Sequence, residues 1–220
     1  MNRIKGVIFD LDGVITETSE YHYMAWKLLA SNIGIYIDRE LNEKLKGVSR
    51  MDSLDIILKH GHRDHDFSDA EKTALATSKN NRYVEMINQF TKKDLLEGVE
   101  ELLCELKVLG IKIGIASASH SAKKLIGLMG IESLVDYIVD PGSVPSKPAP
   151  DIFIKAAEGL GLEPSECIGV EDAVAGIKAI KAAKMYAVGI GDKEILHEAD
   201  RVYSWPSEIR MTELLNSLQS

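Results

Sequence analysis

Two pairs of acidic residues, each directly after an apolar run, are the first candidates for chemistry in this sequence. Asp10 and Asp12 follow the first apolar run of the chain, and Glu171 and Asp172 follow a later one. Ligands of open α/β sheets bind at the carboxyl ends of the strands, so we expect the four carboxyl groups to share one cleft. Two simpler roles stay open, because Asp12 and the glycine after it fit a turn and Asp172 fits a helix N-cap.

Carboxylates gathered in this way repel one another unless a cation lies among them. Two like unit charges about 4 Å apart repel by about 4 kcal/mol at an effective dielectric constant of about 20. No histidine or cysteine adjoins either acidic pair, and a site with only hard oxygen ligands favours Mg²⁺ over Zn²⁺. The sequence therefore predicts a magnesium site.

Two further segments carry groups that suit a phosphate. Ser117, Ser119 and Ser121 follow another apolar run, and hydroxyls with backbone N–H groups at a helix start form an anion site. An ordinary serine N-cap is the simpler role. Lys147 stands between a serine and a proline before a predicted helix, where its ammonium group could meet a phosphate. A solvent-exposed lysine is the alternative.

The elements that would hold these groups alternate between apolar runs and helical patterns. Such runs suit parallel strands that are covered on both faces. They predict strands at Lys5–Asp10, Ile111–Ala116, Tyr137–Val139, Cys167–Val170 and Met185–Gly189, with a weaker candidate at Arg201–Tyr203. Apolar residues at helical spacing predict helices over Val99–Leu109, Ser119–Met129, Pro148–Leu160 and Asp172–Ala183. This alternation indicates a doubly wound, Rossmann-like α/β sheet with parallel strands.

The segment after the first strand departs from this alternation, because it holds helical patterns and no convincing strand. Its helices are expected at Glu20–Asn32, Asp38–Lys46, Met51–His60 and Asp69–Phe90. We interpret residues 18–91 as a helical cap domain inserted into an α/β core domain of residues 1–17 and 92–220. The two crossings between the domains, Thr16–Ser19 and Thr91–Leu95, are hinge candidates.

The composition limits the classes of partner. Among 220 residues, 45% are hydrophobic and 27% charged, as in ordinary soluble proteins. The net charge of −8 argues against nucleic acid as a partner, because binding a phosphate backbone needs clustered Lys and Arg. No apolar run approaches the roughly 20 residues that cross a bilayer, so we expect no membrane partner. Two distant cysteines, Cys104 and Cys167, and the lack of a secretory signal pattern indicate a cytoplasmic protein with reduced thiols.

Four motifs, each expected at the end of a strand, follow one another in a definite order. They are Asp10-x-Asp12, Ser117-x-Ser119, Lys147-Pro148 and Glu171-Asp172. This ordered set resembles the haloacid dehalogenase superfamily over the whole chain. The resemblance implies that Asp10 is a nucleophile that forms an aspartyl phosphate and that Asp12 is the general acid and base.

The same resemblance implies how the remaining site residues act. The catalytic residues Ser117 and Lys147, with the Ala118 backbone, would hold the transferring phosphoryl group. One Mg²⁺ per chain would be held by the Asp10 carboxylate, the Asp12 backbone carbonyl and Asp172. Glu171 would lie beside the metal or act on it through water.

Longer stretches of the chain are similar to one family within the superfamily, the β-phosphoglucomutases. They are Asp10–Trp26, Leu45–Ser53, Lys79–Tyr83 and Ser146–Phe153. The similarity implies a mutase that interconverts β-D-glucose 1-phosphate and glucose 6-phosphate, with β-glucose 1,6-bisphosphate as phosphorylating activator and intermediate. A magnesium-dependent sugar-phosphate phosphatase of the same superfamily is the alternative. We expect a monomer whose partner is a small phosphosugar.

Arg50 is the cap residue on which the choice between mutase and phosphatase most depends. A cation in the first turn of a helix opposes the helix dipole by a few tenths of a kcal/mol, roughly, and a bound anion would reverse that penalty. The resemblance implies that Arg50 holds the phosphate that is not being transferred, while Ser49 and Asp52 also fit a plain capping box. His22 and Lys79 are implied to link cap closure to Asp12. The expected substrate-binding residues are Thr18, His22, Gly47, Val48, Ser49, Arg50, Ser53, Lys79, Ala118, Ser119 and Ser121.

One departure from the family pattern lies beside the serine motif. The family typically has Lys-Asn where this chain has His120-Ser121. Ser121 is shorter than asparagine, so the sugar preference stays open at this position.

Overall fold

The chain folds into two compact units. The computed structural model describes residues 4–46 and 48–219. One unit, here the α/β unit, comprises Met1–Glu17 and Phe90–Ser220, and the other, the helical unit, comprises Thr18–Gln89. No helix among the described residues is both long and apolar enough to cross a membrane.

The described part of the α/β unit contains one six-stranded parallel sheet in the order β3-β2-β1-β4-β5-β6. The strands are β1 Gly6–Phe9, β2 Lys112–Ile115, β3 Tyr137–Ile138, β4 Cys167–Glu171, β5 Tyr186–Ile190 and β6 Arg201–Tyr203. Every predicted strand is confirmed to within one residue at each end. The strand order reverses between β1 and β4, which is the point where doubly wound sheets bind ligands.

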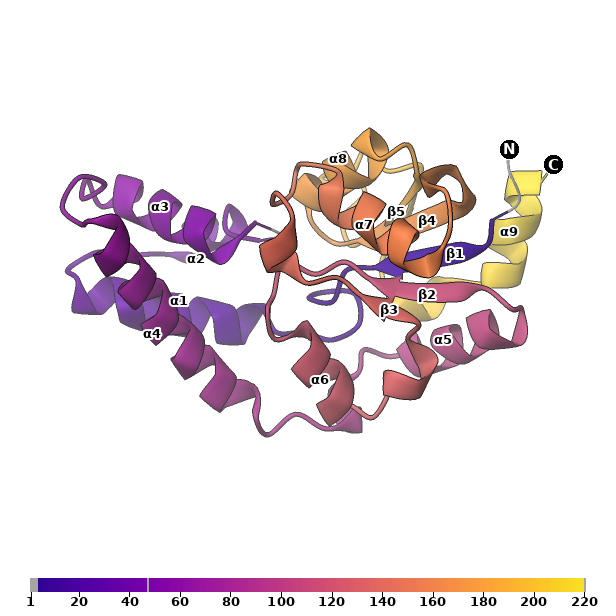
Figure 1. Cartoon of the computed structure of the whole chain (residues 1–220), viewed down its shortest axis with the longest axis horizontal. Coiled ribbons are helices and arrows are strands. Elements are labelled where there is room, and N and C mark those ends of the chain that lie inside the picture. Colours follow the sequence, from indigo (N-terminus) through magenta and orange to yellow (C-terminus); the bar gives the residue numbers. More distant parts are fainter. Residues whose placement is uncertain (1–3, 47, 220) are drawn as a thin grey trace. The chain divides into compact units, whose positions relative to one another are not determined.

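Helices cover both faces of this sheet (Figure 1). They are α5 Val99–Val108, α6 Ala122–Leu128, α7 Asp151–Leu160, α8 Val174–Ala182 and α9 Met211–Gln219. Short 3₁₀ turns lie at Lys92–Asp94, Glu132–Leu134, Pro141–Ser143, Pro164–Glu166 and Pro206–Glu208. In the view of Figure 1, α7 and α8 lie on one face of the sheet, and α5 and α9 lie on the other.

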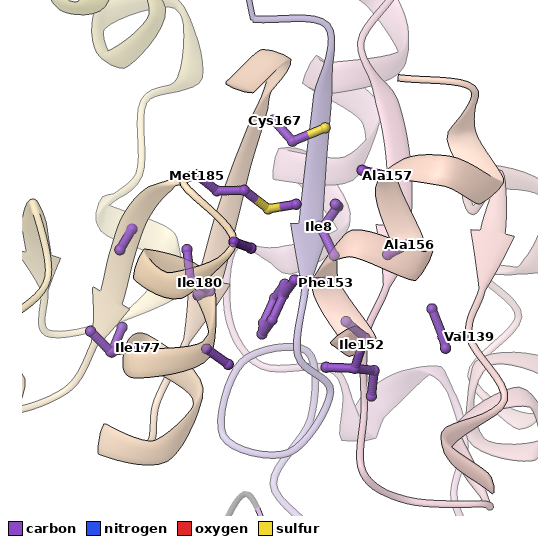
Figure 2. Packing of buried hydrophobic residues seen from close by; sticks show 14 of the residues in the cluster. Ile8, Val139, Ile152, Phe153, Ala156, Ala157, Cys167, Ile177, Ile180 and Met185 are labelled. Carbon is purple, nitrogen blue, oxygen red and sulfur yellow. The ribbon is translucent and has the colours of Figure 1, made fainter. Parts of the chain in front are cut away.

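The core beneath α7 and α8 holds the strand ends in place. Ile8, Phe153 and Ile180 are fully buried in this cluster (Figure 2). Gly169 on β4 permits the close approach of α8, because a Cβ there would lie 2.6 Å from the Ile180 side chain. Each fully buried large apolar side chain contributes about 1.5–3 kcal/mol to folding, so β1 and β4 are firmly placed as supports for the residues that follow them.

The helical unit consists of α1 Ser19–Asn32, α2 Arg39–Glu43, α3 Arg50–His60 and α4 Asp69–Ile87. Residues 18–46 and 48–89 contain no strand, in agreement with the predicted helical segment. Ser49 caps α3 through the Asp52 N–H, and Ser68 forms a capping box with Glu71 at the start of α4. The unit has an apolar core of its own, in which Leu54, Ile57 and Leu58 of α3 are fully buried.

The two chain segments that lead toward the helical unit are tied together at their α/β ends. Thr16 and Leu95 form an antiparallel bridge. The Thr16 hydroxyl donates a hydrogen bond to the Asp94 carbonyl at 2.5 Å, and the Leu96 N–H donates to the Ile15 carbonyl at 3.0 Å. The two predicted hinge candidates therefore contain residues that are bonded to each other, Thr16 in one and Asp94 and Leu95 in the other.

Candidate active site

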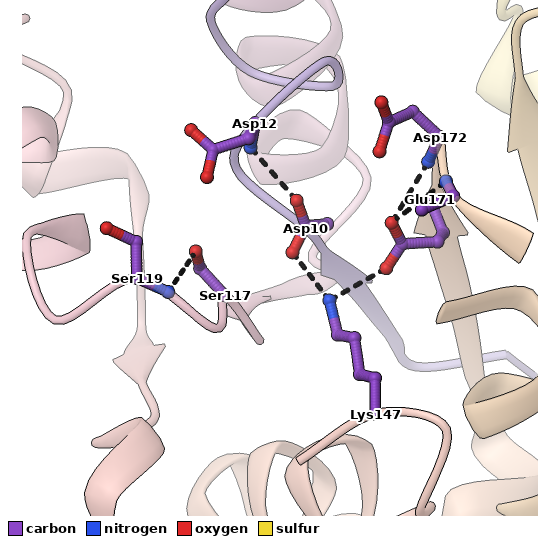
Figure 3. Close-up of polar contacts among 8 residues, drawn as sticks. Asp10, Asp12, Ser117, Ser119, Lys147, Glu171 and Asp172 are labelled. Atoms are coloured by element: carbon purple, nitrogen blue, oxygen red, sulfur yellow. Dashed lines mark hydrogen bonds and ion pairs between the residues drawn. The ribbon is translucent and has the colours of Figure 1, made fainter. Parts of the chain in front are cut away.

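Three carboxyl groups meet where β1 and β4 end. Asp10 follows β1, and Glu171 is the last residue of β4. The two are brought together because Phe9 pairs with Val170 and the Asp10 N–H donates to the Val170 carbonyl at 2.9 Å. One oxygen from each of Asp10, Glu171 and Asp172 lies within 4.8 Å of the others (Figure 3).

A buried lysine joins two of these carboxylates. Lys147 Nζ lies 2.6 Å from Asp10 Oδ1 and 2.7 Å from Glu171 Oε2, and its side chain is fully buried. Burial alone would lower the pKa of Lys147, but the charges of Asp10 and Glu171 outweigh burial and raise it above the ordinary value. The alternative of a solvent-exposed lysine is thereby excluded, because an ammonium group is built into the acid cluster.

Backbone N–H groups fix the orientation of the same carboxylates. The Asp12 N–H donates to Asp10 Oδ2 at 2.9 Å. The N–H groups of Asp172 and Ala173 both donate to Glu171 Oε1 at 3.2 Å. Burial, followed by repulsion from Asp10, raises the pKa of Glu171, and Lys147 opposes the shift. Both oxygens of Glu171 are thus occupied by protein donors, while Asp172 is only half-buried.

Asp172 reaches the cluster because a glycine leaves room for it. Gly13 has a φ of +75°, and a Cβ at this position would lie 2.3 Å from Asp172 Oδ2. The helix that follows begins at Val174 with Ala173 as its N-cap residue and no side-chain cap. Asp172 therefore does not serve as the N-cap of α8, which was the simpler role that the sequence left open.

The donor set of the cluster suits a divalent cation. Carboxylate oxygens of Asp10, Glu171 and Asp172 converge, and Lys147 supplies one positive charge against three acidic groups. Such all-oxygen sites fit Mg²⁺ better than softer metals. The predicted metal ligand Asp12 lies two residues beyond Asp10, and Figure 3 shows its carboxyl group directed away from Lys147 and Glu171.

The serine segment lies beside the cluster on the next strand. The Ala116 N–H donates to the Phe9 carbonyl at 2.8 Å, so Ser117 follows β2 next to the end of β1. Ser117 Oγ accepts from the Ser119 N–H at 3.1 Å, and Ser119 Oγ accepts from the Ser121 N–H at 3.2 Å. The predicted helix start at Ser119 is wrong: α6 begins at Ala122, because these hydroxyls bind the backbone in turns that compete with a helix. Ala118 lies half-buried between them.

In the helical unit, the structure brings His22 and Lys79 into direct contact. Lys79 Nζ lies 2.6 Å from His22 Nδ1, and the His22 ring stacks on Tyr83 with centroids 3.9 Å apart. Lys79 also lies 4.6 Å from the centre of the Trp26 ring. Burial, and then the charge of Lys79, lowers the pKa of His22 well below its ordinary value. A lysine ammonium group only donates hydrogen bonds, so this contact requires a His22 Nδ1 without a proton.

A second group in the helical unit surrounds the start of α3. Ser49 Oγ accepts from the Asp52 N–H at 3.1 Å and donates to Asp52 Oδ2 at 2.6 Å. Arg50 is half-buried, forms no ion pair with any described residue, and has its pKa lowered by burial. Ser53 is buried, and its N–H donates to the Ser49 carbonyl at 2.8 Å. A half-buried cation with no acidic partner in the described chain is suited to an anionic ligand.

The other predicted substrate residues are placed as follows. Thr18 is buried at the N-cap position of α1, and its carbonyl accepts from the His22 N–H at 3.0 Å. Val48 is half-buried. Gly47 lies outside the described residues.

Sequence reasoning missed two residues that shape the cluster. Phe153 lies with its ring centre 5.2 Å from Lys147 Nζ and forms the apolar wall against the ammonium group. Its place in the apolar pattern of α7 signalled only a core residue. Gly13 was noted as a turn residue, and its DG context could have signalled the positive φ but not the contact with Asp172.

Comparison with known proteins agrees with this geometry. Residues 4–184 match the family described as haloacid dehalogenase-like hydrolase. The β-phosphoglucomutase of Bacillus subtilis (strain 168) is 47% identical over 97% of this chain and 94% of its own length. The crystal structure of β-phosphoglucomutase from Clostridium difficile superimposes with a TM-score of 0.96 at 45% identity, over 98% of this chain and 99% of that chain.

A phosphatase is also among the relatives, at lower identity. The fructose-1-phosphate phosphatase of Escherichia coli (strain K12) is 31% identical over 86% of this chain and 97% of its own length. The matches to the mutases are stronger in both identity and coverage of this chain. The chain therefore belongs to the haloacid dehalogenase-like hydrolase family and, within it, to the β-phosphoglucomutases.

Proposed function

We propose that this chain interconverts β-D-glucose 1-phosphate and glucose 6-phosphate through β-glucose 1,6-bisphosphate, with Asp10 as the nucleophile. The observation that carries the proposal is the setting of Asp10. Its two oxygens accept from Lys147 Nζ and the Asp12 N–H, and Asp172 lies in the same cluster. The lysine and the backbone N–H hold the Asp10 carboxyl group in a fixed orientation, as a carboxylate nucleophile requires.

The reaction proceeds in two balanced half-reactions. Phosphorylated Asp10 first gives its phosphoryl group to a sugar hydroxyl, whose proton passes to Asp12. The Asp10 carboxylate then attacks the other phosphate of the bisphosphate, and Asp12 returns the proton to the leaving sugar oxygen. Asp10 is phosphorylated again, and the isomerised monophosphate leaves. General acid–base help of this kind contributes about 10²–10⁴-fold to the rate.

The α/β unit would hold the phosphoryl group with its own residues. Ser117, the Ala118 backbone and Lys147 would contact the phosphoryl oxygens. Asp10 and Asp172 would hold Mg²⁺ through carboxylate oxygens and Asp12 through its backbone carbonyl. Glu171 would act through water, since both of its oxygens already accept hydrogen bonds. When bound, Mg²⁺ neutralises charge on the transferring phosphoryl group, which is the main demand of this chemistry.

The proposed task of the helical unit is to hold the phosphate that is not being transferred and to exclude water. Arg50 supports this role, because its half-buried guanidinium group has no acidic partner in the described chain. His22 and Lys79 support a link to Asp12, since their contact is partly buried and preformed. A bisphosphate needs a second phosphate site, whereas simple hydrolysis of a monophosphate does not.

A sugar-phosphate phosphatase is the second candidate. The observation that favours it is His120-Ser121 beside the serine motif, with His120 exposed to solvent and Ser121 buried. Water would then replace the sugar hydroxyl as the acceptor from phosphorylated Asp10. The two candidates share every residue of the acid cluster and differ in which acceptor reaches it.

Parallel measurement of isomerisation and inorganic phosphate release separates the two candidates. We expect isomerisation of β-glucose 1-phosphate, primed by a trace of β-glucose 1,6-bisphosphate, to exceed phosphate release. Arg50→Ala should lower kcat/KM for isomerisation by about 10- to 150-fold, the value of a lost hydrogen bond to a charged group. Arg39→Ala, which removes an exposed arginine paired with Glu20 in the same unit, is the matched control and should change little.

The nucleophile has its own test. Asp10→Asn should abolish both activities and the uptake of labelled phosphate from the bisphosphate. Phosphate release that outpaces isomerisation in the unaltered protein would assign the chain to the phosphatase instead. Full turnover in Asp10→Asn would remove Asp10 from the mechanism altogether.

A further inference from the structure

We propose that Gly176 is a positioning residue for the acid cluster, because it provides the space that the Glu171 carboxylate occupies. The inference rests on the metal site of the proposed function. Gly176 is buried in the first turn of α8, and it is not one of the residues assigned above to substrate, phosphoryl group or metal. Its effect is exerted through Glu171 and, beyond it, through Lys147.

The contact between the two residues is closer than any side chain at position 176 permits. A Cβ on Gly176 would lie 1.9 Å from Glu171 Oε2, 2.0 Å from Cδ and 2.3 Å from Cγ. Real Cβ atoms essentially never approach another heavy atom closer than 3.0 Å. The φ of Gly176 lies outside the left-handed region, so its backbone conformation is open to alanine. Space for Glu171 is therefore the reason for a glycine here.

Glu171 cannot move away from a new methyl group without losing contacts. Its side chain is fully buried, Oε2 binds Lys147 at 2.7 Å, and Oε1 accepts from two backbone N–H groups. To reach the 3.0 Å limit, Oε2 or the helix must shift by at least 1.1 Å. A shift of Oε2 disturbs its hydrogen bond to Lys147, and a shift of the helix start disturbs the N–H groups of Asp172 and Ala173 that hold Oε1. Either shift changes the shape of the cluster that includes Asp172.

Another helical glycine of the α/β unit offers a matched control. Gly127 lies in α6, and a Cβ there would lie 3.1 Å from Oε1 of Glu132, an exposed side chain that is able to move aside. Both glycines gain helix propensity when changed to alanine. They differ in what the new methyl group meets, which is the variable that the inference concerns.

The first measurement is Mg²⁺ affinity by calorimetry, together with steady-state kinetics. Gly176→Ala should weaken Mg²⁺ binding by about 10–100-fold, as expected when a residue that orients metal ligands is displaced. We expect kcat to fall at saturating Mg²⁺, with the KM for β-glucose 1-phosphate little changed. Gly127→Ala should leave the Mg²⁺ affinity and kcat unchanged. Unaltered Mg²⁺ affinity in Gly176→Ala would overturn the proposal.

The second measurement is thermal unfolding in EDTA, which needs neither metal nor substrate. In a Glu171→Ala background, the carboxylate that blocks position 176 is gone, so Gly176→Ala should raise the melting temperature by about 1–4 °C through helix propensity. In the protein that retains Glu171, Gly176→Ala should lower the melting temperature. If Gly176→Ala folds only when Glu171 is also replaced by alanine, that result supports the inference equally. An equal loss of stability, or failure to fold, in both backgrounds would overturn the inference. Because this test uses no turnover, it stands apart from failure of the proposed function.

Discussion

Replacing Lys147 by methionine tests the electrostatics of the acid cluster, because it removes the ammonium group between Asp10 and Glu171. At an effective dielectric constant of about 20, each of these ion pairs is worth about 6 kcal/mol at its distance of 2.6 or 2.7 Å. The two carboxylates that remain lie within 4.8 Å and repel by at least about 3.5 kcal/mol. The lysine no longer needs to be desolvated, so we expect a net loss of about 3–5 kcal/mol, as for other broken buried pairs.

The assay is urea unfolding followed by circular dichroism, in EDTA and in excess Mg²⁺. The expected loss corresponds to a fall in melting temperature of about 6–20 °C for a chain of this size. Lys181→Met is the matched control, since Lys181 pairs with Asp200 at the same 2.6 Å but is 40% exposed. That pair should contribute no more than about 1 kcal/mol. Mg²⁺ should restore more stability to Lys147→Met than it adds to the unaltered protein, because it neutralises the same carboxylates.

Two results would refute this reasoning. If Lys147→Met lost no more stability than Lys181→Met, the buried carboxylates would not depend on the lysine for their charge balance. If Mg²⁺ stabilised the variant no more than the unaltered protein, the acid cluster would not be the place where the cation binds. The first result concerns the ion pairs alone, and the second concerns the metal site.

Three further predictions concern other parts of the molecule. The pKa of His22 is lowered, so its contribution to stability is complete above pH 6.5 and is lost as the pH falls, by up to about 1.4 kcal/mol per pH unit. His22→Gln should therefore flatten the unfolding free energy between pH 6.5 and about 5, measured in urea. Phe153→Ala, at a fully buried site, should lower the unfolding free energy by about 3–5 kcal/mol, whereas Trp205→Ala, at a site 60% exposed, should change it by about 0.5 kcal/mol or less. Ser68→Ala removes the capping box of α4 and should lower the melting temperature by about 2–4 °C, as expected for a loss of about 1 kcal/mol.

The sheet could be predicted because its strands are uninterrupted apolar runs, which suit parallel strands that are buried on both faces. The same runs place Asp10 and Glu171, since a residue that ends a parallel strand lies at a known edge of the sheet. The start of α6 could not be read in this way. Ser117 and Ser119 bind N–H groups locally, and this choice between turn and helix leaves no trace in the apolar pattern.

The burial of Lys147 and the contact of His22 with Lys79 depend on segments far apart in sequence. Lys147 meets Asp10 across 137 positions, and His22 meets Lys79 across 57. A lysine between a serine and a proline has the same local signature on a surface as in a site. In the fold, α7 packs against β1, and the Phe153 ring centre lies 5.2 Å from the buried Lys147 Nζ, so the tertiary structure removes the lysine from solvent.

In the proposed mechanism, the Asp10-x-Asp12 spacing gives two different tasks to two identical side chains. Asp10 continues the line of β1 into the acid cluster, where a lysine and a backbone N–H fix its carboxylate. Asp12 contributes that N–H, and its own carboxyl group is directed away from the lysine (Figure 3). The two carboxyl groups therefore have different surroundings, which suits the two different roles that we propose for them. The turn at Gly13 produces this separation, and it also admits Asp172. A side chain at position 13 would therefore disturb both Asp12 and the acid cluster, which explains why a glycine follows the Asp10-x-Asp12 motif.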